Sequence, residues 1–310
     1  MLGSSLLRIL KGLGATNAIA PAHGLLELTD ESKVQAFFKE EQPEYVFLAA
    51  AKVGGIKANA TYPADFIRTN LSIQTNVLHA AFQSGVERLI FFGSNCAYPR
   101  DCPQPMREEY LMSGPLEQTS EPYAVAKIAG MKMCAAYNRQ YGTRFLTVIP
   151  PTLYGPHDNF DEQTGHALSA LLCRFHQAKA ASTDSVEIWG SGSPRREFLY
   201  VDDLATACIF LMKLERDALE RTVADIGWVI NAGSGHDLTI RELANKVSDL
   251  VGFHGQILTD PERPDGAARK LLDSSRITSL GWSSQVGLDE GLEATYSWYR
   301  STLAGVASGL

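Results

Sequence analysis

Apolar runs and amphipathic segments alternate along the first half of the chain. Continuous apolar runs over residues 45–55, 88–94 and 145–150 are typical of strands that are buried on both faces. Between them, apolar residues at helical spacing predict one helix over 63–85 and another from about 122 to 142. Because right-handed crossovers turn such a series into a parallel sheet, we expect an α/β fold with a Rossmann-like doubly wound sheet.

The pattern changes after Tyr154. A polar loop is followed by apolar residues at the spacing i, i+3, i+4, i+7, which predict a helix over 166–180, and then by a short strand over 186–190. Thr239 and Glu242 have the spacing of a capping box and predict the start of another helix. We therefore expect one domain over residues 1–155 and a smaller C-terminal α/β region over 156–310, some of whose segments return to the first domain.

The N-terminal segment is open to two interpretations. It carries serines and two basic residues but no acidic residue before Glu27, as transit peptides do. Leu6, Leu7 and Leu10 also fall on one face at helical spacing, so the same segment predicts an amphipathic helix that ends at the glycine of position 12 or 14.

The composition narrows the range of partners. The chain has 310 residues, 45% of them hydrophobic and 20% charged, and its net charge of −7 argues against a nucleic-acid partner. No window holds the roughly 18 consecutive apolar residues that a membrane span needs, so we expect small-molecule ligands and no membrane partner. The five cysteines lack CxxC spacing, which suggests neither a disulfide framework nor a metal site and indicates a reducing compartment.

The candidate chemistry centres on Tyr123 and Lys127. These residues lie four apart on a predicted helix and therefore share a face. We expect the ammonium to lower the phenol pKa from its reference value of about 10, which would make Tyr123 a proton donor to a carbonyl oxygen near neutral pH. The same spacing also occurs on solvated helical faces. However, Ser94 ends a predicted strand upstream, where its hydroxyl could hold the same oxygen.

Several long motifs occur in order along nearly the whole chain: GSNCAYP, GPLEQTSEPYAVAKIAGMKMCAAYNRQYGT, LYGPHDNF, WGSGSPRREFLYVDDLA and RPDGAARKLLD. Together they resemble the GDP-L-fucose synthase family of the extended short-chain dehydrogenase/reductase superfamily. The resemblance implies an NADP(H)-dependent oxidoreductase and isomerase that inverts carbons 3 and 5 of GDP-4-keto-6-deoxy-D-mannose and then reduces the ketone at carbon 4. It also implies a cytoplasmic homodimer that packs through the predicted helices 63–85 and 122–142.

The resemblance assigns catalytic roles to Ser94, Cys96, Tyr123, Lys127 and His166. Each inversion needs one group that removes a proton from one face of the sugar and another that returns a proton to the opposite face. By resemblance Cys96 is the base and His166 the acid, and the reference pKa values of a thiol and an imidazole, about 8.5 and 6.5, suit both transfers. Tyr123 and Ser94 would hold the enolate oxygen. Without the resemblance, a cysteine after a buried strand is ordinarily a small hydrophobe.

The resemblance also implies two sets of binding residues. The first domain would bind the dinucleotide cofactor through Gly3, His23, Phe92, Gly93, Ser94, Asn95, Lys127, Pro150, Pro151, Thr152, Leu153 and His166. The second region would bind the GDP-sugar, with cations on its phosphates, through Arg174, Trp189, Arg196, Asp265 and Lys270. Two alternatives stay open: Arg195 can also be interpreted as a surface charge, and Trp189 can be interpreted as a core residue. The cysteines at 102, 134, 173 and 208 are interpreted as structural.

The N-terminus departs from the family pattern. The family begins with a strand and a GxxGxxG turn that places a pyrophosphate at a helix N-terminus, whereas only the last glycine, Gly3, is present here. We therefore expect the first strand of the sheet to be missing because of an incomplete or misassigned start. For a chain that truly begins at Met1, we expect weak cofactor binding and low stability. The acid-free segment aligns with the family's first helix, which favours the helix over the targeting interpretation.

Two further departures lie near the expected cofactor. His23 stands where the family usually has an arginine for the 2′-phosphate of NADP, which leaves the preference for NADP over NAD open. Pro151 and Thr152 stand in PPTLYGP, where the family has Pro-Thr-Asn-Leu-Tyr-Gly-Pro, and a threonine cannot offer the asparagine amide.

Two rival hypotheses remain at this point. Another nucleotide-sugar epimerase or dehydratase of the same superfamily would return its hydride and hold NAD tightly, but the combination of Cys96 with His166 speaks against it. A degenerate, non-catalytic nucleotide-binding protein would have no use for the complete set of five catalytic residues, which speaks against that hypothesis.

Overall fold

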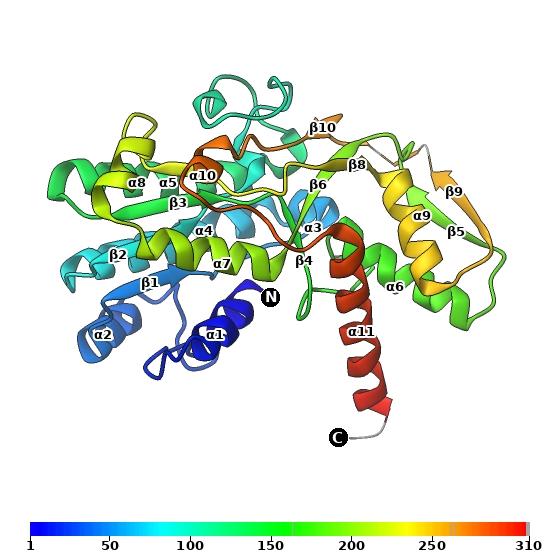
Figure 1. The fold of residues 1–310 in the computed structure, drawn as a ribbon, viewed down its shortest axis with the longest axis horizontal. Coiled ribbons are helices and arrows are strands. Elements are labelled where there is room, and N and C mark those ends of the chain that lie inside the picture. The colour runs from blue at the N-terminus through cyan, green and yellow to red at the C-terminus, as the bar shows by residue number, and fades with distance from the viewer. Residues whose placement is uncertain (163, 261, 264, 308–310) are drawn as a thin grey trace.

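The computed structural model describes residues 1–162, 164–260, 262–263 and 265–307. A parallel sheet forms one layer of the molecule (Figure 1), and its strands run in the order β1-β2-β3-β7. These strands are β1 (Tyr45–Leu48), β2 (Arg88–Phe92), β3 (Phe145–Ile149) and β7 (Val229–Asn231). The register places Ile90 opposite both Phe47 and Leu146, so apolar side chains line up across the sheet. The doubly wound α/β fold expected from the sequence is confirmed.

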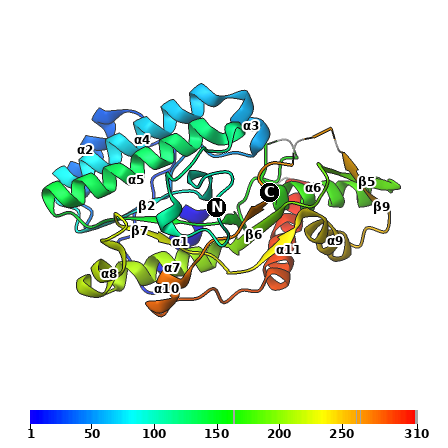
Figure 2. The ribbon, with the colours of Figure 1, turned by 90° about the horizontal axis from the view of Figure 1, so that it is seen from above.

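Helices cover both faces of this sheet (Figure 2). One face carries α2 (Glu31–Glu41), α4 (Pro63–Gln83) and α5 (Glu121–Tyr141), and the opposite face carries α1 (Leu2–Gly12) and α7 (Val201–Lys213). Leu78, Leu89 and Phe145 are buried together on the first face. Leu6 and Leu204 are buried on the second face against Ile90. The sheet is therefore packed between two apolar layers, as its continuous apolar strands require.

A second group of strands follows the change of pattern at Tyr154. Here β6 (Arg195–Tyr200) pairs in parallel with β4 (Thr152–Tyr154) and β10 (Arg269–Lys270) and antiparallel with β8 (Asp237–Thr239). Beside them, β5 (Ser185–Trp189) pairs in parallel with β9 (Gln256–Asp260). The helices α6 (Ala167–Ala180), α9 (Ile240–Val251) and α11 (Leu288–Ala307) pack around these strands on a separate core that includes Phe175, Val247 and Tyr296.

Short elements complete the chain. They are α3 (Ile56–Thr61), η1 (Asn95–Ala97), η2 (Glu108–Tyr110), η3 (Gln118–Ser120), α8 (Arg216–Val223) and α10 (Ser275–Ser279). Within the described ranges, no helix is both long and apolar enough to cross a membrane.

Most helix bounds follow the sequence closely. The helix expected from about 122 to 142 is α5, and Gly142 ends it in the left-handed conformation, φ 68°. Thr239 and Glu242 form the predicted capping box, in which each side chain accepts a hydrogen bond from the other's backbone N–H. The N-terminal segment is helical as α1.

The strand expected over 45–55 is wrong in length and in burial. β1 ends at Leu48, and Tyr45 at its start is 47% exposed. The physical reason is its place in the sheet, because among the described residues only β2 pairs with β1 and its other side has no strand neighbour. An edge strand keeps part of its surface in water even when its sequence is continuously apolar.

Candidate active site

The carboxyl end of β2 places two candidate catalytic side chains next to each other. Ser94 leaves the strand in extended backbone and caps the 3-10 turn η1, and its Oγ accepts a hydrogen bond from the Cys96 N–H at 3.2 Å. Serine is favoured at such a position because its short side chain satisfies a backbone donor that the turn leaves free. The hydroxyl of Ser94 and the thiol of Cys96 are therefore fixed relative to the end of the strand.

Helix α5 brings Tyr123 and Lys127 to the same strand end. The Lys127 ammonium is buried and donates to the backbone oxygen of Phe92 at 2.9 Å, and it lies 5.8 Å from the centroid of the Tyr123 ring. The close approach depends on Gly130, where a Cβ would lie 2.4 Å from Cζ of Phe91. Sequence reasoning missed this glycine, although a glycine inside a helical pattern is a recognised sign of close packing.

Burial dominates the electrostatics of this pair. It lowers the pKa of Lys127 to about 8, and burial together with the nearby Cys96 raises the pKa of the Tyr123 phenol above its usual value, against a smaller opposing effect of Ser94. The prediction that Lys127 would lower the phenol pKa is wrong for this structure, because the ammonium is directed at the Phe92 carbonyl and desolvation outweighs its charge. Tyr123 is consequently protonated near neutral pH and can donate a proton.

The Cys96 thiol has a cationic neighbour from a distant part of the chain. Lys270 Nζ lies 3.8 Å from Cys96 Sγ, in hydrogen-bonding geometry. Burial raises the pKa of this thiol, but the Lys270 ammonium and hydrogen bonds from the hydroxyls of Ser94 and Ser120 outweigh burial, so the pKa lies below its usual value. The site thus combines a thiol biased toward its basic form with a phenol that keeps its proton.

His166 reaches the site from the other region. It is the residue before α6, its backbone oxygen accepts the first helical hydrogen bond from Ala170 at 2.9 Å, and its side chain is half-buried. The loop before it is attached to the start of α3, where the Gly55 N–H donates to the Thr164 oxygen at 3.1 Å. In the described part of the chain the His166 ring makes no hydrogen bond or ion pair, so its pairing with Cys96 stays a prediction.

The other residues expected at the cofactor fall into two groups. Most lie at or near strand ends: Phe92 is the last residue of β2, Gly93 and Asn95 follow it, Pro150 and Pro151 lie between β3 and β4, and Thr152 and Leu153 lie in β4. Gly3 lies in α1. A Cβ on Gly3 would lie 3.7 Å from the Cβ of Ala49, so the start of α1 lies beside the end of β1. His23 has a side chain that is 90% exposed and an Nε2 that lies 3.7 Å from a carboxylate oxygen of Glu27.

Trp189 at the end of β5 is flanked by two guanidinium groups. The Arg174 guanidinium carbon lies 5.8 Å from the indole centroid and that of Arg263 lies 4.9 Å from it. Cations at these distances are attracted to an aromatic face. Arg174 also donates to the backbone oxygen of Glu187 at 2.5 Å, which holds it against β5. Trp189 is half-buried, which favours the binding-surface interpretation over the core interpretation, and Arg263 is a residue that sequence reasoning missed.

Asp265 is engaged by the turn that follows Trp189. Its carboxylate accepts from the Ser191 N–H at 2.7 Å and from the Ser191 hydroxyl at 2.9 Å. A Cβ at Gly190, which has φ 71°, would lie 2.2 Å from the carboxylate, so only glycine fits there. The structure therefore gives Asp265 a role in shaping this turn.

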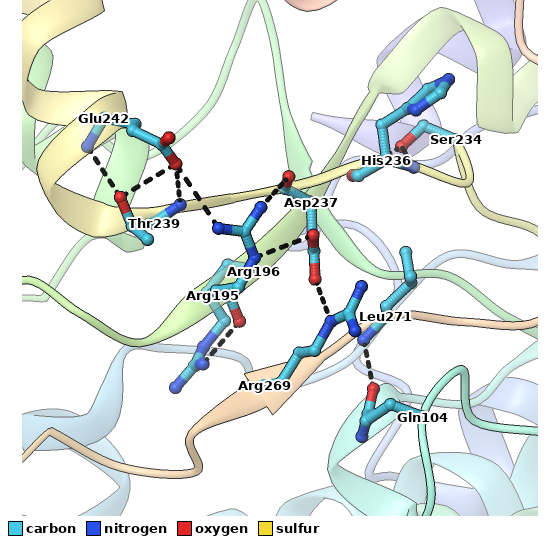
Figure 3. A network of polar contacts seen from close by, with 10 residues as sticks. All are labelled: Gln104, Arg195, Arg196, Ser234, His236, Asp237, Thr239, Glu242, Arg269 and Leu271. Carbon is cyan, nitrogen blue, oxygen red and sulfur yellow. Dashed lines mark hydrogen bonds and ion pairs between the residues drawn. The ribbon is translucent and has the colours of Figure 1, made fainter.

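The pairing of β6 with β10 sorts four cations into two groups. Arg195 and Arg269 are register partners, and both bind the buried carboxylate of Asp237 (Figure 3), Arg195 at 3.0 Å. Arg196 and Lys270 are the next register partners and project from the opposite face, since side chains alternate along a strand. Arg195 thus forms a structural ion pair with Asp237, and this role replaces its interpretation as a surface charge. Arg196 and Lys270 face the site.

Glu197 is a buried acid that sequence reasoning missed. It follows Arg196 in β6, is 1% exposed, and accepts hydrogen bonds from the backbone N–H groups of Gly235 and Leu272, each at 2.8 Å. Burial raises its pKa to about 7 against the opposing effect of these bonds. The signal was available in the sequence, because a glutamate directly precedes the apolar run FLYV, where a buried carboxyl is unusual.

Replacing Glu197 by glutamine is expected to flatten the pH dependence of stability. A carboxyl whose folded pKa is raised above its unfolded value binds its proton more tightly in the folded state. Its contribution is therefore fully present below the unfolded pKa of 4.5 and is lost as pH rises through about 7. The free energy of unfolding should fall by about 3 kcal/mol over this range through this group alone. Urea denaturation between pH 4.5 and 7.5 measures it.

The matched control for this experiment is Glu187→Gln, because Glu187 is exposed on β5. The control should keep the wild-type slope of unfolding free energy against pH, whereas Glu197→Gln should lose part of it. Equal slopes in all three proteins would show that Glu197 does not titrate on unfolding.

The chain is similar to proteins of known classes over most of its length. Residues 1–227 match the model of the NAD dependent epimerase/dehydratase family. The probable GDP-L-fucose synthase 1 of Oryza sativa subsp. japonica is 53% identical, and the alignment covers 96% of this chain and 89% of that protein. The GDP-L-fucose synthase of Escherichia coli K12 is 49% identical, with 96% and 93% covered.

A solved structure matches the fold of this chain over nearly its whole length. A GDP-mannoheptose C4 reductase from Campylobacter jejuni with NADP bound superposes with a TM-score of 0.86 at 39% identity. The match covers 96% of this chain and 95% of that one.

Proposed function

Since the chain belongs to the NAD-dependent epimerase/dehydratase family and, within it, to the GDP-L-fucose synthases, we propose that it converts GDP-4-keto-6-deoxy-D-mannose to GDP-L-fucose with NADPH. The observation that carries this proposal is the Cys96 thiol beside the Ser94, Tyr123 and Lys127 set. A reductase needs only the proton donor and its partners. A thiol with a lowered pKa at the same strand end adds the base that epimerisation requires.

The residues at the strand ends fit NADP(H). The buried Lys127 ammonium has three N–H donors, and in the part of the chain that the structure describes only the Phe92 oxygen accepts from it. The remaining donors suit the ribose hydroxyls of a dinucleotide, and the start of α1 beside the end of β1 suits its phosphates. When bound, NADPH supplies the hydride that reduces the carbon-4 ketone.

The epimerisation follows from two proton-handling groups on different elements. The C–H bonds at carbons 3 and 5 are acidic because each adjoins the ketone. Cys96, as thiolate, takes the proton from one face, and the Ser94 and Tyr123 hydroxyls donate to the enolate oxygen that results. His166, carried by the start of α6, returns a proton to the opposite face. This division of roles requires the base and the acid to lie on opposite sides of the sugar ring.

Reduction uses the same oxygen-binding groups in a second role. Tyr123 donates its phenolic proton to the carbon-4 oxygen, and the Lys127 ammonium, 5.8 Å from the ring centroid, offsets part of the desolvation cost of the phenolate that remains. The GDP end of the substrate is held by the guanidinium and indole groups around Trp189 and by Arg196.

The proposal also assigns cofactor binding and substrate binding to different regions of the chain. Residues 1–155 would bind the cofactor and 156–310 mainly the substrate, while β7, α7 and α10 return to the first sheet.

We further propose a homodimer that packs through α4 and α5, since Val125 and Tyr141 on α5 are 40% and 50% exposed. The five cysteines are all free, which supports a reducing, cytoplasmic location. A sedimentation mass near the monomer value of 33.8 kDa would contradict the dimer.

The proposed function is tested by mixing the purified protein with GDP-4-keto-6-deoxy-D-mannose and NADPH and following the nicotinamide absorbance. We expect substrate-dependent oxidation of NADPH and a slower reaction with NADH. A protein that binds the GDP-sugar but never oxidises NADPH would support the non-catalytic alternative.

A further inference from the structure

We propose that Lys270 is a catalytic residue of the epimerisation, because its ammonium stabilises the thiolate form of Cys96 that removes the proton from the sugar. The use of this thiolate rests on the proposed function, whereas its presence in the free protein does not. The contact that motivates the proposal joins Lys270 Nζ and Cys96 Sγ at 3.8 Å, across 174 residues of sequence.

Lys270 is held at the thiol by the loop that also carries Cys96. This loop continues from η1 to Met106, and it forms two hydrogen bonds with the residue after Lys270. The Leu271 N–H donates to the Gln104 side chain at 2.9 Å (Figure 3), and the Leu271 oxygen accepts from the Met106 N–H at 2.7 Å. The ammonium and the thiol thus lie on two segments that are fastened to each other.

A second attachment fixes Lys270 from the side of β6. Lys270 pairs with Arg196 in the strand register, and the next residue in β6, Glu197, accepts from the Leu272 N–H at 2.8 Å. A lysine side chain on an unattached loop would lose much of its interaction energy to rotamer entropy. Backbone attachments on both sides of Lys270 reduce that cost, which distinguishes this contact from a chance surface approach.

The charged groups around Cys96 favour its anionic form. Lys270 approaches from β10, Arg196 from β6 and the neutral phenol of Tyr123 from α5. Glu117 and Asp265 interact with Arg196, and Cys102 interacts with Lys270. Apart from burial, the groups that act most strongly on the Cys96 thiol are the Lys270 ammonium and the hydroxyls of Ser94 and Ser120, and each of them favours the thiolate.

This role differs from the one that the family resemblance implies for Lys270, which is a contact to the nucleotide sugar. A lysine that only bound phosphate would change KM when removed and would leave the free thiol unaltered. A lysine that stabilises the thiolate changes the titration of Cys96 in the absence of any substrate.

The test measures the alkylation of Cys96 by iodoacetamide as a function of pH in the free protein. Tryptic digestion separates Cys96, in the peptide 89–100, from Cys102, in the peptide 101–107, so the two thiols are quantified separately. The variants are Lys270→Met, Lys270→Gln and Lys270→Arg. Lys246→Met serves as the matched control, because Lys246 pairs with Asp289 on the surface, away from β10.

In the Met and Gln variants, the alkylation midpoint of Cys96 is expected to move to higher pH by about one to three pH units. For a one-unit move, the rate at pH 7 should fall about threefold, because the tenfold loss of thiolate is partly offset by its higher nucleophilicity. Lys270→Arg should keep the midpoint close to wild type, and Lys246→Met should be unchanged. Rescue by arginine separates a charge effect from a structural one.

A midpoint that is the same in Lys270→Met, Lys270→Gln and the wild type would overturn the proposal. Because neither NADPH nor the GDP-sugar is present, that outcome would leave the proposed function standing. Conversely, a shifted midpoint in a protein that fails to oxidise NADPH would support the Lys270 inference while the proposed function failed. Thermal melts establish that each variant is folded, and the arginine variant keeps the test available where a neutral side chain is not tolerated.

Discussion

Replacing Cys96 by serine is expected to lower the rate of epimerisation by about 10²- to 10⁴-fold, the usual contribution of a positioned general base. A serine hydroxyl is a far weaker acid than a thiol, so the Lys270 ammonium at 3.8 Å cannot convert it to an effective base at neutral pH. The side-chain volume changes little, so the fold and NADPH binding should be retained. The measurement is the incorporation of solvent deuterium at carbons 3 and 5 of the sugar, followed by NMR in D₂O.

The matched control is Cys102→Ser, in the same loop and also half-buried. It should keep deuterium incorporation within a few-fold of wild type. If Cys96→Ser exchanged deuterium as fast as the wild-type protein, Cys96 would not be the base. The direct reduction of the unepimerised ketone should survive in Cys96→Ser, because Tyr123 and Lys127 are untouched.

Replacing Tyr123 by phenylalanine is expected to produce the opposite pattern. Loss of the phenolic proton donor should lower the rate of NADPH oxidation by about 10²- to 10⁴-fold. Deuterium incorporation should fall much less, since the thiol of Cys96 remains and the Ser94 hydroxyl can still donate to the enolate oxygen. The ring keeps its edge-on contact with Phe66, so little stability is lost. Stopped-flow absorbance of NADPH and NMR on the same sample measure both rates.

Tyr141→Phe is the control for this substitution, because Tyr141 lies on the same helix, is 50% exposed and stacks on Phe82. Its activity should equal that of the wild type. Should Tyr123→Phe lose exchange and reduction to the same extent, the phenol would act in both steps equally, and the separation of roles proposed here would be wrong.

The local parts of the site follow from the sequence. Tyr123 and Lys127 share a helical face by spacing alone, and Ser94 lies at a strand end because an apolar run stops there. The capping box at Thr239 is equally local. Residues within one or two turns of each other are positioned by the geometry of their own element, which a single sequence specifies.

The electrostatics of the site do not follow from spacing. The same i, i+4 pair that predicts a lowered phenol pKa has a raised one, because the direction of the Lys127 ammonium and the depth of burial depend on tertiary packing. The contact between Lys270 and Cys96 depends on the register of β10 with β6, and no local pattern indicates which of two adjacent cations faces the thiol. The approach of Arg263 to Trp189 joins a loop to the end of β5 in the same way.

The edge position of β1 shows a further limit. Its apolar run predicts burial on both faces, but burial of a strand also depends on neighbours that lie elsewhere in the chain. Glu197 is the converse case, since an acid directly before an apolar run indicates a buried carboxyl but does not identify the backbone donors that it binds.

One site is proposed both to invert and to reduce the sugar. The decisive experiment runs the reaction of wild-type protein with GDP-4-keto-6-deoxy-D-mannose and NADPH in D₂O and determines the product by NMR. We expect GDP-L-fucose that carries deuterium at carbons 3 and 5 and protium from NADPH at carbon 4. A product reduced at carbon 4 without deuterium at carbons 3 and 5 would contradict this proposal and would identify a reductase that does not epimerise.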